Sequence, residues 1–452
     1  MKLPILFALL ATFLAHGSQK PNIVIIIADD CTFRDLGCYG GQAHTPNLDR
    51  LATEGMRFTR CFQAAPMCSP TRHNIFTGLY PVTSGAYPNH THVDPGTPSI
   101  VQHLKPLGYR VAQSGKTHVS PASVFTWEKI PGSKNPEFDK VQTFVEDVSK
   151  SETPFCLLLC SNEPHTPWNL GDPSRYPVDQ IKLPPYLLDT PETRKGMSRY
   201  LAEITYFDDQ VGQAMKIIAD QGLNENTLFL VVSEQGNSLP FAKWTCYDNG
   251  LQSGFIARWP GTIKANSINP AMVEYIDLLP TFIEVAGGTP PASLQGRSLL
   301  PVFAGKESHK EFVYGIMTTK GIINGSDHYG IRSIRSEKFK YIWNLTPDLE
   351  FRNACMTAPE FVSWEKRADA GDEKARDLVK RYKVRPPVEL YDVVNDPLEL
   401  HNLADDPKLQ DVQANLEKRL KAWMKTCGDL GQETELRALE RMPGRGKKKA
   451  QK

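Results

Sequence analysis

The sequence predicts an α/β protein with a doubly wound central sheet and a smaller α+β domain at its C-terminus. Two observations favour this fold. Short apolar runs without alternation recur along the chain, which is typical of strands buried on both faces of a parallel sheet. Stretches with helical spacing of apolar residues lie between these runs, and strand–helix alternation is typical of doubly wound domains.

Four apolar runs are the predicted strands, and each is followed by polar or ionisable residues. They are Ile23–Ala28 before Asp29-Asp30, Tyr109–Ser114 before Gly115-Lys116-Thr117-His118, Phe155–Leu159 before Asn162, Glu163 and His165, and Leu228–Val232 before Ser233-Glu234-Gln235-Gly236. In open α/β sheets, ligands bind beyond the carboxyl ends of the strands. The sequence therefore predicts a functional site where these four clusters meet.

Two helices are predicted between the strands. Pro46–Gly55 has proline at its first position and Thr45 as its expected N-cap. Ser198–Gln221 places apolar residues at roughly helical spacing and stops at Gly222. Inside the second helix, Phe207-Asp208-Asp209 is expected to support packing and capping and to take no part in chemistry.

From about residue 327 the pattern becomes that of a small α+β domain. Ile331–Ile342 and Glu389–Asp392 predict strands, and Lys408–Met424 predicts an amphipathic helix. The final residues are basic and contain glycine, which is typical of a disordered tail. We predict a catalytic domain over residues 19–326, a C-terminal domain over 327–440 and a basic tail over 441–452.

The first 18 residues have the pattern of a secretory signal peptide. Lys2 precedes an apolar run to Leu14, which small residues follow. This run is too short to cross a bilayer, and no later segment is apolar enough, so no membrane anchor is expected. The predicted location is an exported one: periplasmic, secreted or lysosome-like.

Charge and cysteine content set further limits. The formal net charge of +1 gives no overall attraction to nucleic acid, so no nucleic-acid partner is expected. Export would allow disulfides, and the chain has nine cysteines. An odd number leaves at least one cysteine unpaired or modified, and Cys68 is the candidate.

Two short segments are the most informative about chemistry. In Cys68-Ser69-Pro70-Thr71-Arg72, the proline predicts a loop entering a helix, whose N-terminus suits a tetrahedral anion. Taken alone, this pattern is more typical of a structural cysteine before an ordinary helix. Asp29 and Asp30 offer hard oxygen ligands, which favour Ca²⁺ or Mg²⁺ over zinc; the alternative is a solvated loop.

Cys-x-Pro-x-Arg is the signature of type I sulfatases, and Met67–Arg72 followed by Thr77-Gly78 resembles it closely. Other segments resemble that family in the same order: Pro21-Asn22-Ile23-Val24, Thr45-Pro46-Asn47-Leu48-Asp49, Asp277-Leu278-Leu279-Pro280-Thr281, and Glu389-Leu390-Tyr391-Asp392 with Asp396-Pro397. The resemblance runs from about Lys20 to Pro407. Within the family, the chain most resembles the heparan N-sulfatases (sulfamidases). The segments that carry this resemblance are Gly115–Val119, Gly296–Pro301 and Phe339–Leu345.

The resemblance implies an alkaline-phosphatase/sulfatase-like fold and a nucleophile made from Cys68. A formylglycine-generating enzyme would oxidise the thiol to formylglycine (3-oxoalanine), whose hydrate attacks sulfur with one oxygen and expels sulfate by re-forming the aldehyde. The resemblance also implies one Ca²⁺, with Mg²⁺ less favoured. Its implied ligands are Asp29, Asp30, Cys68, Glu234 and Gln235. Glu234 stands where the family usually has aspartate, one methylene shorter.

The family's other site residues match positions in this chain. Arg72 is implied to hold the formylglycine oxygens, and Lys116 and Lys243 are implied to contact the sulfate oxygens. The resemblance implies that His118 is the base of sulfate release and that His165 is the acid or hydrogen-bond donor at the leaving group. For the segment with His90 and His92, a substrate-pocket lining and a polar surface loop both stay open.

The implied activity is hydrolysis of a sulfate ester or sulfamate on a glycosaminoglycan-like saccharide, and the sequence does not decide between N- and O-sulfate. Two alternatives remain. One is a phosphonate or phosphodiester hydrolase of the same superfamily. The other is an inactive glycan-binding relative, which the Glu234-Gln235 pair would support and the intact cysteine motif opposes.

Overall fold

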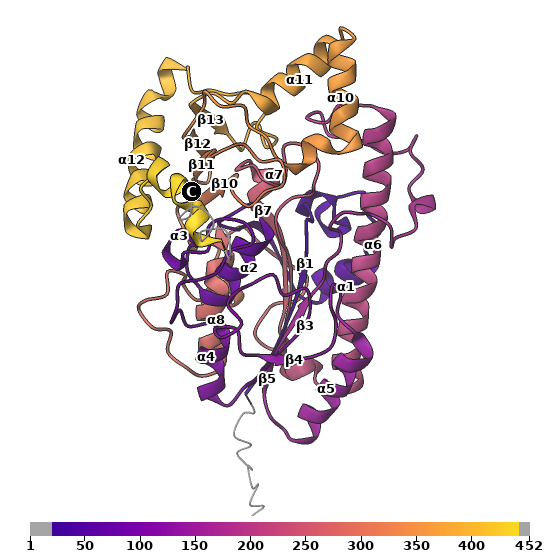
Figure 1. Cartoon of the computed structure of the whole chain (residues 1–452). Helices are drawn as coiled ribbons and strands as arrows, with labels where there is room; N and C mark the ends of the chain where they lie inside the picture. Colours follow the sequence, from indigo (N-terminus) through magenta and orange to yellow (C-terminus); the bar gives the residue numbers. More distant parts are fainter. Residues whose placement is uncertain (1–19, 443–452) are drawn as a thin grey trace, which may run out of the picture.

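The structure is a computed structural model that describes residues 20–442 (Figure 1). The predicted signal peptide and residues 443–452 of the predicted tail lie outside the described residues. Arg441, the first residue of that predicted tail, lies in the 3₁₀ helix Ala438–Arg441 and forms an ion pair with Asp94. At this residue the prediction of a disordered tail is wrong.

A mixed sheet lies at the centre of the described chain. Its strand order is β4-β3-β5-β1-β6-β7-β2-β8, with β9 paired to β2. The bounds are β1 Asn22–Ala28, β2 Met56–Phe62, β3 Arg110–Gly115, β4 Glu128–Lys129, β5 Phe155–Cys160, β6 Thr227–Ser233, β7 Gln252–Arg258, β8 Ser267–Asn269 and β9 Val273–Glu274. The four predicted strands, β1, β3, β5 and β6, are parallel neighbours, as expected. The sheet is mixed because β7 runs antiparallel to both β6 and β2.

Helices cover both faces of this sheet. Along β1, Val24 and Ile26 join one core, whereas Ile23 and Ile25 join the other, so the strand is buried on both sides. The first core includes residues of α1 Pro46–Glu54, α5 Phe138–Lys150 and α6 Pro191–Asp220. The second includes residues of α2 Cys68–Thr77, α4 Ile100–Leu104 and α8 Leu278–Val285. Figure 1 shows the two groups on opposite sides of the strands, which confirms the predicted doubly wound class. Three short helices complete this part: α3 Pro81–Ser84, α7 Asp248–Leu251 and α9 Leu300–Phe303.

The N-terminus of α1 is capped by a side chain from α6. Asp208 accepts hydrogen bonds from the backbone N–H of Asn47 at 3.0 Å and of Leu48 at 2.8 Å. It also accepts one from the Asn47 side chain at 2.9 Å. Thr45 occupies the predicted N-cap position, but its side chain makes no capping bond, because its hydroxyl donates to the Asp49 carboxylate. The predicted capping role of Asp208 is confirmed, and the helix that it caps is α1.

A second, antiparallel sheet forms the C-terminal part, in the order β10-β11-β12-β13. Its strands are β10 Val313–Thr318, β11 Gly330–Arg335, β12 Phe339–Asn344 and β13 Val388–Asp392. The accompanying helices are α10 Pro359–Asp369, α11 Glu373–Lys383, α12 Gln410–Cys427 and α13 Gln432–Leu436. Leu416 and Leu420 of α12 pack on Ile334 and Tyr341 of the sheet. Because β10 precedes residue 327, this sheet begins before the predicted domain boundary.

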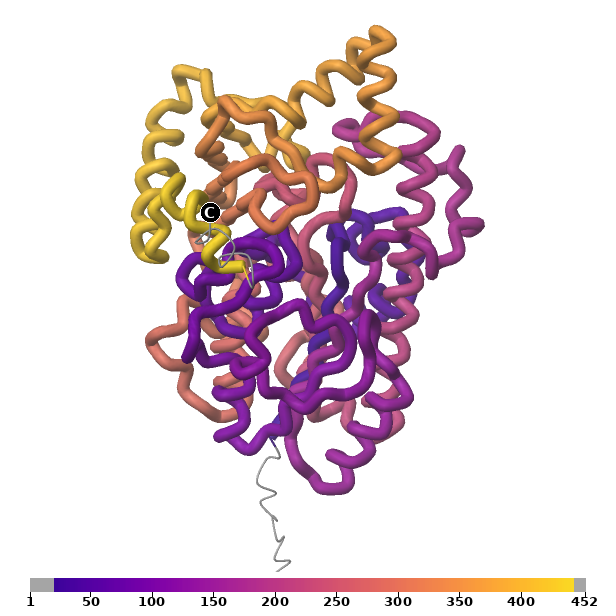
Figure 2. The backbone as a smooth tube through the Cα atoms, viewed as in Figure 1, coloured from indigo at the N-terminus to yellow at the C-terminus, as the bar shows by residue number. Residues whose placement is uncertain are grey.

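The end of the described chain returns to the predicted catalytic domain, residues 19–326. The Tyr87 hydroxyl donates to the Thr434 carbonyl at 2.8 Å, and the Thr91 hydroxyl donates to the Arg441 carbonyl at 2.6 Å. Figure 2 shows the yellow C-terminal segment lying against the purple N-terminal part. The loop that carries His90 is therefore held by residues more than 340 positions later.

The nine cysteines all lie within residues 20–442, and none of them forms a disulfide there. In the same range, no helix has both the length and the apolar character that crossing a bilayer requires.

Candidate active site

The four polar clusters predicted from the sequence meet at one edge of the central sheet. Backbone hydrogen bonds just beyond the strand ends keep the polar clusters next to one another. The Glu234 N–H donates to the Ala28 carbonyl at 2.9 Å, and the Lys116 N–H donates to the Cys160 carbonyl at 2.8 Å. The carboxyl ends of β1, β3, β5 and β6 thus lie side by side. The predicted meeting point is confirmed.

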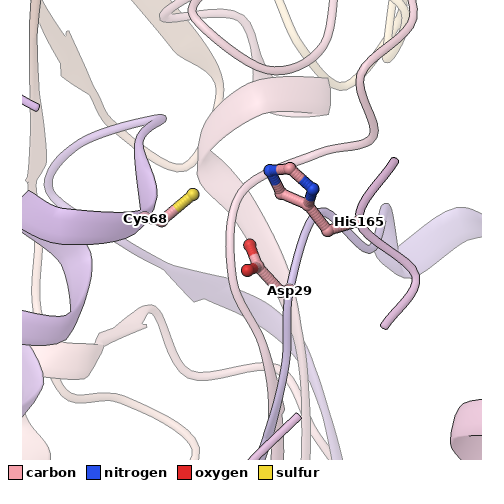
Figure 3. A group of neighbouring side chains, drawn as sticks. All are labelled: Asp29, Cys68 and His165. Carbon is pink, nitrogen blue, oxygen red and sulfur yellow. The ribbon is translucent and has the colours of Figure 1, made fainter. Parts of the chain in front are cut away.

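Cys68 begins helix α2 and faces this edge. Met67 occupies the N-cap position, and the Cys68 side chain is 2% exposed. Its Sγ lies 4.0 Å from Asp30 Oδ1. One ligand atom each from Asp29, Cys68 and His165 lie within 4.8 Å of one another, and Figure 3 shows the three side chains pointing toward a common space.

Three buried carboxylates surround the side-chain amide of Gln235. Its Nε2 donates to Asp30 Oδ1 at 2.5 Å and lies 3.3 Å from Asp29 Oδ1 and 3.4 Å from Glu234 Oε2. The amide nitrogen also lies 3.0 Å from Cys68 Sγ. A positively polarised group therefore occupies the point on which these ligand atoms converge.

This arrangement fits a hard divalent cation. The Gln235 Oε1 atom is buried and has no hydrogen-bond partner among the described residues. Turning the amide over would present that oxygen to the same carboxylates, and the two orientations of an amide are chosen by their surroundings. Carboxylate and amide oxygens are the ligands that Ca²⁺ prefers. The residues present therefore fit such an ion.

Three cations, of which Arg72 and Lys243 are buried, balance these carboxylates. Lys116 forms an ion pair with Asp29, Lys243 Nζ lies 2.6 Å from Asp30 Oδ2, and Arg72 forms an ion pair with Glu234. Burial alone would raise the pKa of Asp29, but Lys116 and other nearby cations hold it well below its usual value. Asp29 is therefore ionised at neutral pH.

The thiol of Cys68 is not activated in this setting. Burial, together with the adjacent Asp29 carboxylate, raises the pKa of Cys68 above its usual value. The thiolate is the reactive form of cysteine. The unmodified side chain is consequently a poor nucleophile here.

His165 presents its Nε2 to the cluster. Its Nδ1 lies 2.6 Å from the Thr166 carbonyl, which can only accept, so Nδ1 carries the proton. The Nε2 atom lies 3.6 Å from Asp30 Oδ2. Burial lowers the pKa of His165, although Asp30 opposes this effect. The imidazole therefore faces the cluster and is neutral at neutral pH.

His118 forms a pair with His90 beside Lys116. The distance from His118 Nε2 to His90 Nδ1 is 2.9 Å. Burial and the positive charge of Lys116 lower the pKa of His118 to about 2. Its Nδ1 is buried without a hydrogen-bond partner among the described residues. The structure thus joins His90 to the site through His118, but no such bond links the described part of the site to His92.

Several residues of this site have a backbone conformation that is rare for residues other than glycine. The φ angles are 58° at Asp30, 57° at His90, 50° at His118 and 66° at Trp244. Positive φ is disfavoured for side chains with a Cβ and tends to cluster at functional sites. The fold therefore tolerates local strain to hold these side chains in place.

Two contributions to the site were not predicted from the sequence. The Ser238 hydroxyl donates to Asp30 Oδ2 at 2.8 Å, and the Trp244 ring lies 4.9 Å from Lys243 Nζ. Both residues follow β6 in the same segment as Glu234. A short polar stretch after a predicted strand was the available signal, but it does not specify which of its side chains turn inward.

Known proteins resemble the chain in sequence and in fold. Residues 21–288 match the family model described as Sulfatase, and residues 236–350 match that of N-sulphoglucosamine sulphohydrolase, C-terminal. An ulvan-active sulfatase of Formosa agariphila is 35% identical over 426 residues, which cover 91% of this chain and 82% of that protein. Human N-sulphoglucosamine sulphohydrolase is 24% identical over 481 residues, which cover 93% of each chain.

The fold is also that of a solved structure of a protein in complex with its substrate, D-glucosamine-2-N,6-O-disulfate. The TM-score is 0.68 at 21% sequence identity, and the match covers 92% of this chain and 99% of that chain.

Proposed function

The chain belongs to the sulfatase family, and on that premise we propose that it hydrolyses a sulfate ester or sulfamate on a sulfated saccharide at the cluster around Cys68. One observation carries this proposal: position 68 opens helix α2 beside the buried carboxylates of Asp29 and Asp30, which form ion pairs with Lys116 and Lys243. Fixed cations in a water-poor site stabilise the negative charge that develops on a transferring group. The names of the relatives support a glycan substrate, in the glycosaminoglycan-like class.

The proposed cofactor is one Ca²⁺ held by Asp29, Asp30, Glu234, Gln235 and the side chain at position 68. The support is the oxygen-rich donor set and the unpartnered Gln235 Oε1 described above. When bound, the ion would supply positive charge beside the sulfate group and offset the repulsion between the carboxylates. Mg²⁺ is the less favoured ion, because it demands a more regular octahedral shell.

We further propose that a formylglycine-generating enzyme converts Cys68 to formylglycine, whose hydrate supplies the attacking oxygen. The weak reactivity of the unmodified thiol supports this conversion. Arg72 is well placed to hold the oxygens at position 68. Its Nη1 donates to the Lys116 carbonyl at 2.8 Å and its Nε faces Glu234, so the guanidinium is fixed on two sides.

The remaining side chains would bind sulfate and move protons. Lys116 and Lys243 would contact sulfate oxygens, and both keep their charge because neighbouring carboxylates raise their pKa against the effect of burial. His165 would donate a proton to the leaving group, and His118 would accept one from position 68. A bound sulfate anion would favour the protonated form of both imidazoles and so raise their pKa.

The same proposal covers location. We propose that residues 1–18 direct export and that the mature protein acts without a membrane anchor, in a periplasmic, secreted or lysosome-like compartment. The pattern of the first residues supports export.

Mass spectrometry of the peptide containing Cys68 tests the proposal most directly. Conversion to formylglycine lowers the peptide mass by about 18 Da relative to the thiol. The active protein should contain the lighter peptide, and Cys68→Ala should have no detectable turnover while keeping its thermal unfolding profile. An active protein that retains a plain thiol at position 68 would overturn the proposal.

Kinetics on matched substrates separates the alternatives. An aryl sulfate should be hydrolysed faster than an aryl phosphodiester, and N-sulfated and 6-O-sulfated glucosamine distinguish sulfamidase from ester hydrolase. A faster phosphodiester reaction would favour the second hydrolase class. Binding of sulfated saccharides without turnover would favour an inactive relative.

A further inference from the structure

A cleft of about 660 Å³ opens beside the proposed reaction centre. This volume is within the usual range for small-molecule sites, about 300–1,000 Å³. Its walls come from the loop after β5, from α6, from the segment after β6 and from residues 354–360 of the C-terminal part. The C-terminal part thus contributes one wall of a space that the catalytic part alone would leave open.

One end of this cleft is continuous with the site. Ser238 lines the cleft, and its hydroxyl donates to Asp30 Oδ2 at 2.8 Å. Trp244, another lining residue, directly follows Lys243, and Thr166 directly follows His165. A substituent on the leaving group of the reaction would therefore extend into this cleft.

Two indole rings give the cleft an apolar surface. Trp168 is held in one orientation, because its Nε1 donates to the Pro164 carbonyl at 2.8 Å and its ring packs 5.6 Å from the ring of Tyr200. Trp244 is buried and held by its backbone N–H, which donates to the Pro66 carbonyl at 3.0 Å. Fixed aromatic rings provide large contact areas at little entropic cost. The C–H face of a sugar ring fits such a surface.

Arg199 of α6 supplies positive charge in the cleft. Among the described lining residues it is the only cation, and Glu360 is the only anion. Arg199 and Glu360 interact electrostatically, but within residues 20–442 no ion pair shorter than 4.0 Å joins Arg199 to a carboxylate. The guanidinium is exposed and available to a ligand. Its planar fork of donors matches carboxylate and sulfate groups.

We propose that this cleft binds the sugar next to the sulfated one and that Arg199 recognises a carboxylate or a second sulfate on that neighbouring sugar. The inference rests on the proposed function, because that function places the sulfated sugar at the other end of the cleft. The substrate class is thereby narrowed to acidic oligosaccharides that carry a second anionic group.

Binding measurements test this inference independently of turnover. The probe is a desulfated disaccharide of glucuronic acid and N-acetylglucosamine, titrated calorimetrically into the mature protein. The methyl ester of its carboxyl group is the neutral counterpart. The second anionic probe is the same disaccharide with its carboxyl group reduced to an alcohol and one 6-O-sulfate added, so that the sulfate is its only anionic group. We expect at least one anionic probe to bind about tenfold more tightly than the neutral one, and to lose this advantage as salt rises.

Three variants assign the effect to residues. Arg199→Met should remove the preference for the anionic probe. Arg175→Met should keep it, because Arg175 is an exposed arginine of the nearby 3₁₀ helix Pro173–Arg175 that does not line the cleft. Glu360→Gln should strengthen binding of the anionic probe two- to fivefold by removing the opposing charge. A gain of affinity cannot come from misfolding.

The outcomes distinguish the two proposals. If the protein binds the carboxylate probe or the sulfate probe more tightly than the neutral probe, and Arg199→Met removes this difference, the cleft assignment is supported. The probe that binds more tightly then identifies the anionic group that Arg199 recognises. Equal binding of neutral and anionic probes, or an unchanged preference in Arg199→Met, overturns it. Turnover of an aryl sulfate depends on the proposed reaction centre, so its absence would contradict the proposed function while the binding result still decides the cleft.

Discussion

The guanidinium of Arg72 and the carboxylate of Glu234 form an ion pair in which both side chains are fully buried. The family that the sequence resembles usually has aspartate at position 234. The additional methylene of glutamate brings its carboxylate to Arg72 while Oε2 stays 3.4 Å from the amide nitrogen of Gln235. Glu234 thus links the proposed metal ligands to the cation that faces position 68.

Two substitutions at Glu234 separate charge from length. Glu234→Gln should lower the free energy of unfolding by about 3 kcal/mol, because it leaves the charge of Arg72 without its nearest partner in the protein interior. Glu234→Asp keeps the charge and should cost less stability, but should lower kcat about tenfold as Arg72 loses its contact. Urea unfolding and kinetics measure the two effects. Equal stability of both variants would contradict a structural role for the pair.

Calcium should stabilise the folded protein. Three carboxylates face one another around Gln235, and a divalent ion would relieve their repulsion. At a calcium concentration 100 times Kd, the free energy of unfolding should rise by about 2.7 kcal/mol relative to the chelated protein. Thermal unfolding after chelation, with Ca²⁺ or Mg²⁺ restored, measures this shift. Identical unfolding temperatures under all three conditions would contradict a metal site here.

Glu203 of α6 should position the loop that carries His165 and Trp168. Its carboxylate accepts hydrogen bonds from the backbone N–H of Leu170 at 2.6 Å and Gly171 at 3.1 Å, and a further one from Asn169. Glu203→Ala should raise KM for saccharides about tenfold with a smaller effect on kcat, and should make the loop more sensitive to limited proteolysis.

Glu192→Ala is the control for this experiment, because Glu192 is an exposed residue in the first turn of the same helix. A loss in kcat alone, without change in KM or proteolysis, would argue against loop positioning by Glu203.

Asp208→Ala should destabilise the protein through helix α1. Loss of a capping carboxylate costs about 0.5–2 kcal/mol, and Asp208 serves two backbone N–H groups at once, so the upper end is expected. The neighbouring Asp209 is exposed, and Asp209→Ala should change the free energy of unfolding by less than about 0.5 kcal/mol. Chemical denaturation of the two variants side by side tests the difference.

Asp277 should make stability depend on pH below about 4. Burial would raise its pKa, but Lys310 and His309 lower it from 3.8 to about 2. A depressed pKa contributes stability that is present above the pKa of the unfolded state and lost as pH falls toward the folded value. The contribution is about 2 kcal/mol at neutral pH. The stability gap between wild type and Asp277→Asn should therefore narrow between pH 4 and pH 2; a constant gap would refute this assignment.

The sequence predicted the strands that carry the site better than the strands that complete the sheet. β1 and β6 are apolar throughout and buried along their length, so their pattern identifies them. β2 was not predicted, because Arg57, Thr59 and Arg60 interrupt its apolar residues and lie only partly buried. Its position in the sheet is fixed by pairing with β7, far away in the sequence.

The residues of the site likewise fall into those that a local motif identifies and those that only long-range packing brings there. Asp29 and Cys68 were predictable because short motifs surround them, whereas Ser238 reaches Asp30 across 208 positions of the sequence. The wall formed by residues 354–360 is held in place by the packing of α10 on α6, and no local pattern encodes that contact. Long-range packing thus determines the parts of the site that the sequence left unpredicted.

The anchoring of residues 87–94 by residues 434–441 has a consequence for how the protein is made. The ribosome releases the His90 loop more than 340 residues before the residues that fasten it. Removing residues 434–441 should leave that loop untethered beside the catalytic centre. The His90 loop would then reach its final position beside His118 only after residues 434–441 have been synthesised and have folded onto it.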